Sequence, residues 1–212
     1  MALPQAKTDV TEARLAALSV PDGAGWARAA RQSALARVRA MGLPVRRDEY
    51  WKFTNPVDLV APAAPEAALF DPGEAPIFGE IDRLRIVFVD GVFDPEASDD
   101  LAMEHVEIDR LAEASQIDIH WGRDLYGTLE ERGQDPVHRP LAAMNTAMAT
   151  DGVLIRVTGQ APRPIAFTYL HKNTRSDATL HHVVRVEPGA EVTLLENGPA
   201  AARFNKCMEI DI

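Results

Sequence analysis

The sequence has little of what several common functional sites require. It contains a single cysteine, Cys207, among 212 residues, which excludes a disulfide framework and any metal or cluster site built only from cysteines of this chain. Its 22 Lys and Arg residues are outnumbered by 32 Asp and Glu residues, so the formal net charge is −10. Because phosphate binding needs an excess of Lys and Arg, neither nucleic acid nor an anionic membrane is an expected partner.

Long apolar runs and common ligand-binding motifs are also missing. No run approaches the roughly 18 apolar residues of a membrane span, and the first residues lack the apolar segment of a secretory signal. We therefore expect a cytoplasmic protein. The sequence has no G-x-G-x-x-G, G-x-x-x-x-G-K-[ST], H-E-x-x-H or C-x-x-C pattern, so no nucleotide or zinc site is indicated.

The first 150 residues are predicted to be mainly helical. Apolar residues recur every three or four positions within residues 8–42 and 138–149, which is typical of amphipathic helices. Prolines recur between residues 56 and 76, where they remove backbone donors and predict an extended Pro/Ala-rich connector without regular structure. Asp90 and Gly91 supply the turn of a predicted β-hairpin over residues 84–94.

Short β-strands are predicted after residue 150. Runs rich in apolar and β-branched residues, separated by glycine and proline, occur at 153–157, 165–169, 182–186, 192–196 and 206–212. Such a series indicates a sandwich, a barrel or a solenoid. In the last run Met208, Ile210 and Ile212 alternate with acidic residues up to the end of the sequence, so we expect a truncated part of a longer protein.

Candidate metal ligands are scarce. His181 and His182 are adjacent, whereas a cupin-type site needs two histidines at i and i+2 on one face of a strand. Adjacent side chains on a strand point to opposite faces, so these two cannot both face one metal ion. We interpret one as packed and the other as solvated, and Cys207 as a strand residue without chemistry.

The densest group of aromatic and charged residues lies at 43–55, directly after a predicted helix end at Gly42. It could be a recognition surface, because Trp and Arg dominate the anchors of protein interfaces. It could equally be a packed turn, with Tyr50, Trp51 and Phe53 in the core. We favour the packed turn and predict that Trp51 is a buried structural anchor.

This segment also carries a resemblance. Residues 41–54, Met-Gly-Leu-Pro-Val-Arg-Arg-Asp-Glu-Tyr-Trp-Lys-Phe-Thr, resemble a stretch of the SufD family, which are subunits of the SUF scaffold that assembles iron–sulfur clusters. Further similar segments follow in the expected order at 87–93, 141–155 and 181–196. The residues that match the family motifs, with structural or interface roles, are Arg46, Glu49, Trp51, Lys52, Thr54, Asn145, Asp151 and Gly152.

The resemblance implies an α+β fold in which an N-terminal helical domain with a small hairpin, residues 1–150, is followed by the first coils of a parallel β-helix, residues 151–212. It implies a non-catalytic scaffold subunit that acts with SufB-like and SufC-like subunits. No cofactor is expected on this chain alone, and an iron–sulfur cluster only in the full complex. The chain resembles an N-terminal fragment that lacks the cluster-associated region of the family.

A truncated solenoid leaves backbone groups of its outermost coil unpaired. We therefore expect the isolated chain to form a homodimer through its C-terminal strands. Two other functions stay open at this point. One is a small cupin-like metal-binding β protein, which the spacing of His181 and His182 disfavours. The other is a protein-interaction module without a cluster role, for which residues 46–55 would be the contact surface.

Overall fold

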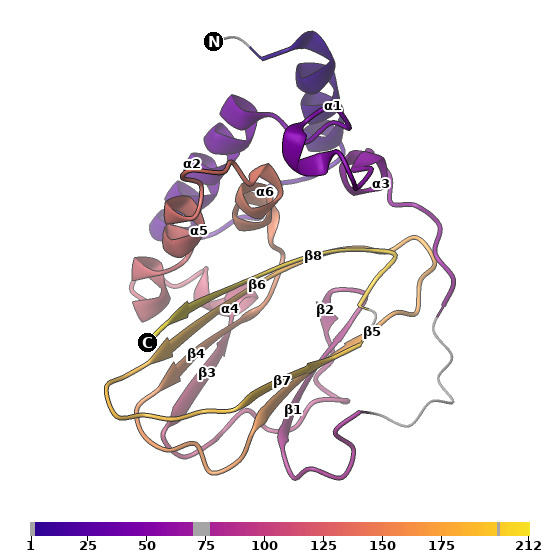
Figure 1. Cartoon of the computed structure of the whole chain (residues 1–212). Coiled ribbons are helices and arrows are strands. Elements are labelled where there is room, and N and C mark those ends of the chain that lie inside the picture. Colours follow the sequence, from indigo (N-terminus) through magenta and orange to yellow (C-terminus); the bar gives the residue numbers. More distant parts are fainter. Residues whose placement is uncertain (1–2, 70–76, 199) are drawn as a thin grey trace.

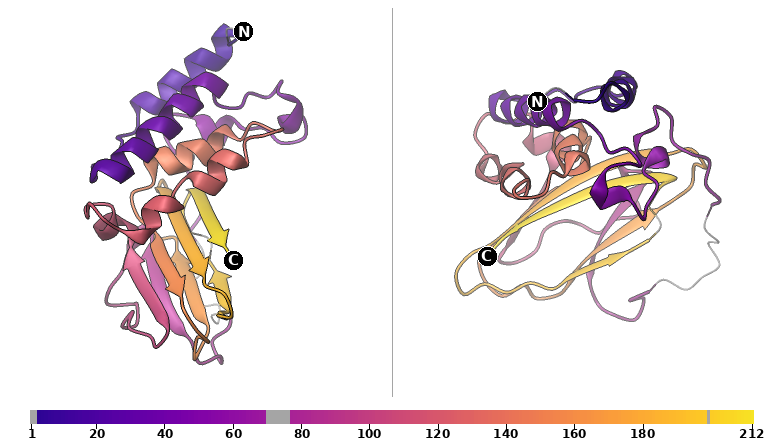
Figure 2. Two further views of the ribbon diagram at one scale, coloured as in Figure 1. Left: turned by 90° about the vertical axis from the view of Figure 1, so that its left-hand side faces the viewer. Right: turned by 45° about the horizontal axis from the view of Figure 1, so that its top comes forward.

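The computed structural model describes residues 3–69, 77–198 and 200–212. These residues form a layer of helices and two stacked β-sheets (Figures 1 and 2). The helices cover one face of the sheet that contains β6 and β8. The other face of that sheet packs against the sheet that contains β1 and β5 (Figure 1). Among the described residues, every helix is too short or too polar to cross a membrane.

The helical layer is built mainly from three helices. On α2, Ala27, Ala34 and Val38 recur at helical spacing and are fully buried. Val38 packs in one cluster with Leu15 of α1 and Met144 of α6, so the helices predicted within 8–42 and at 138–149 are confirmed. The helices are α1 (Gln5–Ala16), α2 (Gly25–Met41), α3 (Val57–Val60), α4 (Leu111–Ala114), α5 (Thr128–Arg132) and α6 (Pro140–Met148), with short 3-10 helices η1 (Glu49–Trp51) and η2 (Trp121–Asp124).

Each sheet has four strands and is mixed but mostly parallel. The sheet below the helices has the order β3-β4-β6-β8, and the second sheet has the order β2-β1-β5-β7. The pairs β1–β2 and β3–β4 are antiparallel, and the other neighbours are parallel. The strands are β1 (Leu84–Val89), β2 (Val92–Phe93), β3 (Val106–Arg110), β4 (Val153–Val157), β5 (Ile165–Leu170), β6 (Asp177–Val186), β7 (Leu194–Asn197) and β8 (Arg203–Asp211).

The main core lies between the two sheets. Phe88 of β1 and Phe167 of β5 are fully buried there against Ile155 of β4 and Val184 of β6. Successive residues of a strand face opposite sides. The strands of the sheet β3-β4-β6-β8 therefore give alternate residues to this core and to the helical layer. Leu154 and Val183 accordingly face the helices, in a second cluster with Tyr126 and Leu111.

β8 is tied to the helical layer through a buried arginine. Arg203, which is 4% exposed, binds both carboxylate oxygens of Asp177 on β6 at 2.6 and 3.0 Å. Its guanidinium also donates to the carbonyls of Asp58 and Ala61 at the end of α3. Arg14 of α1 binds the same Asp177 carboxylate at 2.8 Å. Two salt bridges to Asp177 therefore join α1, β6 and β8, and hydrogen bonds from Arg203 add α3.

The predicted fold class, a helical domain followed by the first coils of a β-helix, is wrong. The described residues form an α/β fold with two mixed sheets that are neither closed nor solenoidal, and helices are interleaved with the strands. The strands at 84–89 and 106–110 belong to the same two sheets as the strands after residue 150. The prediction failed because local alternation specifies a strand but not the distant strand with which it pairs.

Two local predictions in the first 150 residues had different outcomes. The hairpin at 84–94 is confirmed, since Val89 pairs with Val92 across Asp90 and Gly91, whose φ angles are 49° and 85°. The connector predicted at 56–76 contains α3, because Pro56 precedes the first helical turn, where its missing N–H costs nothing. Residues 61–69 have no helix or strand, and 70–76 lie outside the described residues.

Candidate functional site

Residues 48–54 form an exposed aromatic turn around η1. The Tyr50 residue is 75% exposed and Phe53 is 92% exposed, whereas Trp51 is half-buried. The backbone turns tightly, with the Trp51 N–H donating to the Asp48 carbonyl at 2.9 Å and the Thr54 N–H donating to the Trp51 carbonyl at 3.1 Å. The interpretation of this segment as a packed turn with all three rings in the core is therefore wrong for Tyr50 and Phe53. The prediction that Trp51 is buried is also wrong, because the ring is half-buried and lines a groove.

Other residues anchor this turn to the protein. Leu43 is fully buried, and Pro56 on the far side of the turn is also buried. The Asp48 carboxylate accepts from Lys7 Nζ of α1 at 2.8 Å and from the Val45 N–H at 3.2 Å. Because these contacts hold both ends, the aromatic rings at the tip are not needed for the core.

A groove separates the aromatic turn from the loop that leads into α6. The groove has a volume of about 490 Å³, and its walls are Tyr50, Trp51, Thr54, Val137, His138, Arg139, Pro140 and Leu141. An adjoining hollow of about 230 Å³ shares several of these residues and extends to Lys7, Met41, Asp48 and Pro136. We call the two hollows together the Trp51 groove.

The polar groups at the Trp51 groove are open to a ligand. Within residues 3–69, 77–198 and 200–212, the Tyr50 hydroxyl and the Trp51 indole N–H have no hydrogen-bond partner. The Lys52 ammonium lies 5.0 Å from the centroid of the Phe53 ring. The groove thus combines aromatic and prolyl surfaces with hydrogen-bond donors and cations.

The motif residues separate into two groups in the structure. Arg46, Glu49, Lys52 and Thr54 are exposed in or beside the aromatic turn, together with half-buried Trp51. The other three, Asn145, Asp151 and Gly152, are buried at the junction of α6, β4 and β6. The structure therefore brings the first five residues to one surface and gives the last three internal contacts.

Asn145 fastens α6 to two strands. Its side-chain amide donates to the Leu180 carbonyl of β6 at 3.0 Å and to the Asn205 carbonyl of β8 at 2.9 Å. Asn205 in turn donates to the Leu141 carbonyl of α6 at 2.9 Å. Since Asn145 is fully buried, this amide has a structural role.

Asp151 and Gly152 shape the entry into β4. The Asp151 carboxylate forms an ion pair with Arg110 of β3 and accepts the Ala112 N–H at 3.1 Å, at the start of α4. Gly152 has a φ of 152°, and a Cβ at this position would lie 1.8 Å from the His181 carbonyl oxygen. Only glycine allows this close approach of β4 to β6.

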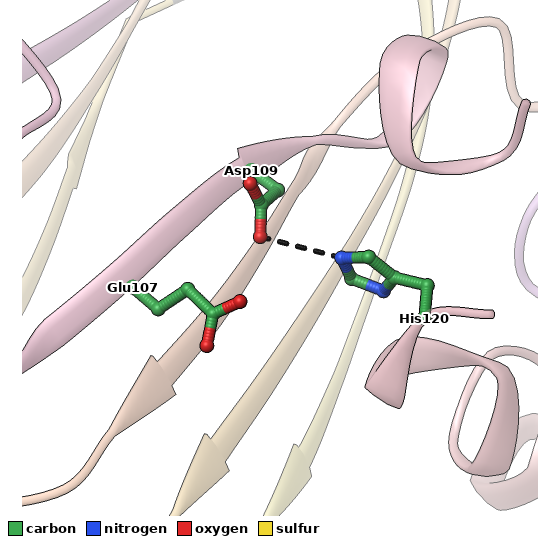
Figure 3. Close-up of side chains that lie close together, drawn as sticks. All are labelled: Glu107, Asp109 and His120. Atoms are coloured by element: carbon green, nitrogen blue, oxygen red, sulfur yellow. Dashed lines mark hydrogen bonds and ion pairs between the residues drawn. The ribbon is translucent and has the colours of Figure 1, made fainter. Parts of the chain in front are cut away.

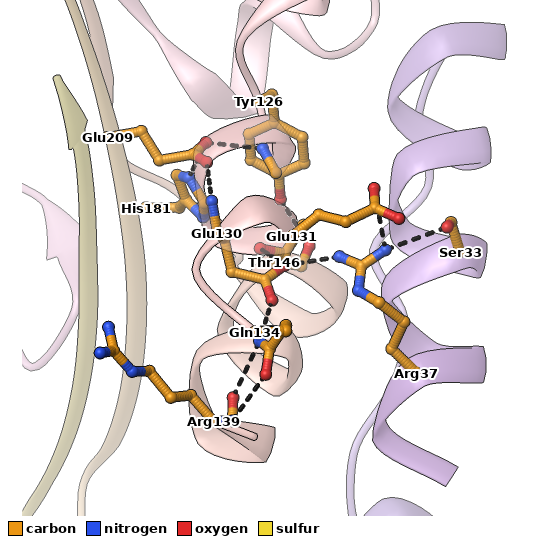
Figure 4. Close-up of polar contacts among 11 residues, drawn as sticks. Ser33, Arg37, Tyr126, Glu130, Glu131, Gln134, Arg139, Thr146, His181 and Glu209 are labelled. Atoms are coloured by element: carbon orange, nitrogen blue, oxygen red, sulfur yellow. Dashed lines mark hydrogen bonds and ion pairs between the residues drawn. The ribbon is translucent and has the colours of Figure 1, made fainter. Parts of the chain in front are cut away.

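A buried polar network connects β8 and β6 with α5, α6 and α2 (Figure 4). The Glu209 carboxylate accepts the Gly127 and Glu130 N–H groups at 2.6 and 2.7 Å and contacts His181 Nε2 at 2.9 Å. Glu130 contacts Arg37 of α2 at 2.6 Å and Thr146 of α6 at 3.0 Å. These side chains are enclosed by protein, so the network serves to hold the helices on the sheet.

His182 lies in the core between the sheets. Its Nδ1 accepts the Val153 N–H at 3.1 Å, and its Nε2 lies 3.1 Å from the Tyr169 hydroxyl, which donates to Glu196 at 2.8 Å. Burial, and then the charges of Lys206 and His181, lower the pKa of His182 to about 3. The interpretation that one of the two histidines is solvated is wrong, because β6 is a central strand covered on both faces and both rings are fully buried.

Cys207 lies in an environment that disfavours its thiolate form. It is half-buried and pairs in register with His181. Burial, followed by the negative charges of Glu209 and Glu130, raises the pKa of the Cys207 thiol to about 12. Since the thiolate is the reactive form, the thiol stays unreactive near neutral pH.

A second candidate centre lies at the edge strand β3, where Glu107, Asp109 and His120 come together (Figure 3). The sequence did not reveal this cluster because His120 is distant in sequence from the two acids. The local signal was the i and i+2 spacing of Glu107 and Asp109, which places both on one face of a strand. The Gly122 N–H donates to His120 Nδ1 at 3.0 Å, so Nε2 carries the proton and faces Asp109 at 3.3 Å.

This hydrogen bonding disfavours a metal ion at the three residues. A metal ligand must offer a lone pair, and His120 Nδ1 already uses its lone pair to cap η2. Binding through Nε2 would move the proton to Nδ1 and break the bond to Gly122. The three side chains therefore fit a polar surface contact better than a divalent cation.

A scan of protein-family models and a search of curated proteins found no match to this chain.

Proposed function

We propose that the chain is a non-catalytic scaffold subunit that binds other proteins through the aromatic turn and the Trp51 groove. The exposure of Tyr50 and Phe53 beside the groove carries this proposal. Aromatic and arginine side chains supply most of the binding energy of protein interfaces. Exposed apolar side chains that gather in one patch, as Tyr50 and Phe53 do in this turn, mark binding surfaces more often than single exposed residues do.

The internal polar groups also support a role without catalysis. Glu209, His181 and His182 are buried ionisable groups of the sheet below the helices, and each makes hydrogen bonds within the fold. Cys207 has a raised pKa. The cluster of Glu107 and Asp109 on β3 with His120 before η2 favours a metal-binding alternative, and the tautomer of His120 argues against it.

We further propose that the process is iron–sulfur cluster assembly, with SufB-like and SufC-like subunits as partners. Support for this step comes from the resemblance. Five of its eight residues lie in or beside the aromatic turn, namely Arg46, Glu49, Trp51, Lys52 and Thr54. Exposed residues in a loop are a stronger indication of function than core residues, because packing does not account for them. The cluster would be cargo of the assembled complex.

The test is affinity purification of the tagged protein from its own cells, with detection of SufB-like and SufC-like subunits by mass spectrometry. We expect both to copurify, and a Tyr50→Ala/Phe53→Ser variant to recover them at least several-fold less well. An Ile119→Ala/Val92→Ala variant, which also removes exposed apolar side chains, should behave as wild type. Absence of both subunits from the wild-type sample would reject the role in cluster assembly.

A further inference from the structure

We infer that the Trp51 groove binds an extended, acidic, proline-containing segment of a partner protein. This inference rests on the proposed function as a protein-binding subunit and specifies the chemistry of the partner.

The shape of the groove favours an extended segment. Its two hollows share Tyr50, Trp51 and Pro140, so a ligand can pass from one hollow to the other along the aromatic turn. Aromatic and prolyl walls are the surface on which polyproline II segments dock, because the rings of proline pack flat against them. Such a segment is already extended and loses little conformational entropy on binding.

The donors match the backbone of such a segment. A polyproline II segment has no internal hydrogen bonds, so its carbonyl groups are free to accept. The Tyr50 hydroxyl and the Trp51 indole N–H can donate to these carbonyls, since neither has a partner among the described residues of the chain. A helical ligand would have its carbonyls occupied and would leave both donors unused.

The charges around the groove favour acidic side chains. Arg46, Arg47 and Lys52 are exposed in or beside the aromatic turn that forms one wall of the groove, and they form no ion pair within the described residues, while Glu49 and Asp135 are the nearby acids without a basic partner. Asp48 is neutralised by Lys7. The chain as a whole has a net charge of −10, so an acidic segment is repelled by most of the surface and attracted to this part of it.

The test uses the purified full chain and short fluorescein-labelled peptides made of Glu, Pro and Ala, with binding followed by fluorescence anisotropy. We expect saturable binding that weakens as ionic strength rises. Replacing Glu by Lys should abolish binding, and replacing Pro by Ala should weaken it. Tyr50→Ala and Lys52→Gln should each weaken binding about tenfold, the size of effect typical of interface anchors, and Ile119→Ala should leave it unchanged.

The outcomes separate this inference from the proposed function. Equal binding of the Glu and Lys peptides, no binding of either, or binding unaffected by Tyr50→Ala would overturn the inference. If the SUF subunits still copurify in a Tyr50-dependent manner, the proposed function stands and the chemistry of the partner is different. If the acidic peptide binds as expected but no SUF subunit copurifies, the groove is correctly described and the role in cluster assembly is wrong.

Discussion

At the scale of single residues, His182 makes the stability of the protein depend on pH. The folded protein disfavours a proton on this ring, with a pKa of about 3, whereas the unfolded chain has the ordinary histidine pKa of about 6.5. Below about pH 6.5 the unfolded state therefore takes up a proton that the folded state does not, and the free energy of unfolding falls. Above that pH the contribution of His182 is constant.

We predict that wild-type protein loses about 2 kcal/mol of unfolding free energy through His182 between about pH 7 and pH 5. His182→Gln cannot titrate, so its unfolding free energy should change less over the same interval. Urea unfolding at several pH values measures this, with His138→Gln, an exposed histidine, as control. Parallel pH profiles of wild type and His182→Gln would contradict the prediction.

At the scale of secondary structure, α5 depends on a carboxylate from another element. A helix of five residues is not stable alone in water. Glu209 of β8 accepts two N–H groups at the first turn of α5, where the helix dipole also favours a negative charge. The strand therefore fixes the helix, and α5 should open when this side chain is removed.

We predict that Glu209→Ala destabilises the protein by roughly 3–5 kcal/mol, because it leaves His181 and two backbone N–H groups buried without a partner. Hydrogen exchange of the α5 amides should accelerate before that of the central strand β6. Cys207→Ala, on the same face of β8, removes a side chain that forms none of these bonds and should cost much less. Unchanged exchange in α5 would show that the helix is held by other contacts.

The individual elements were largely predictable from sequence, but their partners were not. The strands at 153–157 and 165–169 match β4 and β5 because both lie in apolar runs bounded by turn residues. Parallel pairing of Leu84 with Ile165 leaves no local signal. The segment at 43–55 was identified as unusual from the sequence, but the exposure of Tyr50 and Phe53 was not predicted. An apolar side chain can be buried in a core, but many apolar side chains in folded proteins remain exposed.

At the scale of the whole molecule, the two sheets end side by side in β7 and β8, each of which has one neighbouring strand among the described residues. Between these strands, Lys206 Nζ lies 2.6 Å from both oxygens of Glu196. An inward-pointing charge on an edge strand disfavours nonspecific pairing. The backbone edge of β8 nevertheless remains available to pair with a second copy of the chain. Ile210, which is 43% exposed, can contact that copy as well.

We predict a weak homodimer in which the β8 strands of two copies associate about a two-fold axis. Light scattering across a concentration series should show the mass rising from monomer toward dimer. Ile210→Lys places a charge on the edge and should shift this rise to higher concentration. Val20→Lys, at a similarly exposed site in the loop after α1, should not. A monomer mass at every concentration would refute the prediction.

The parallel pairing of β1 with β5 has a consequence for synthesis on the ribosome. β1 is an apolar strand whose register partner, beginning at Ile165, is translated about 80 residues later. At a translation rate of roughly 5–20 residues per second, β1 is without β5 for on the order of 4–16 s and can pair only with the two-residue strand β2. A nascent chain that stalls in this interval exposes an unpaired apolar strand that can aggregate. Slow translation or a lack of chaperones should therefore reduce the yield of native protein.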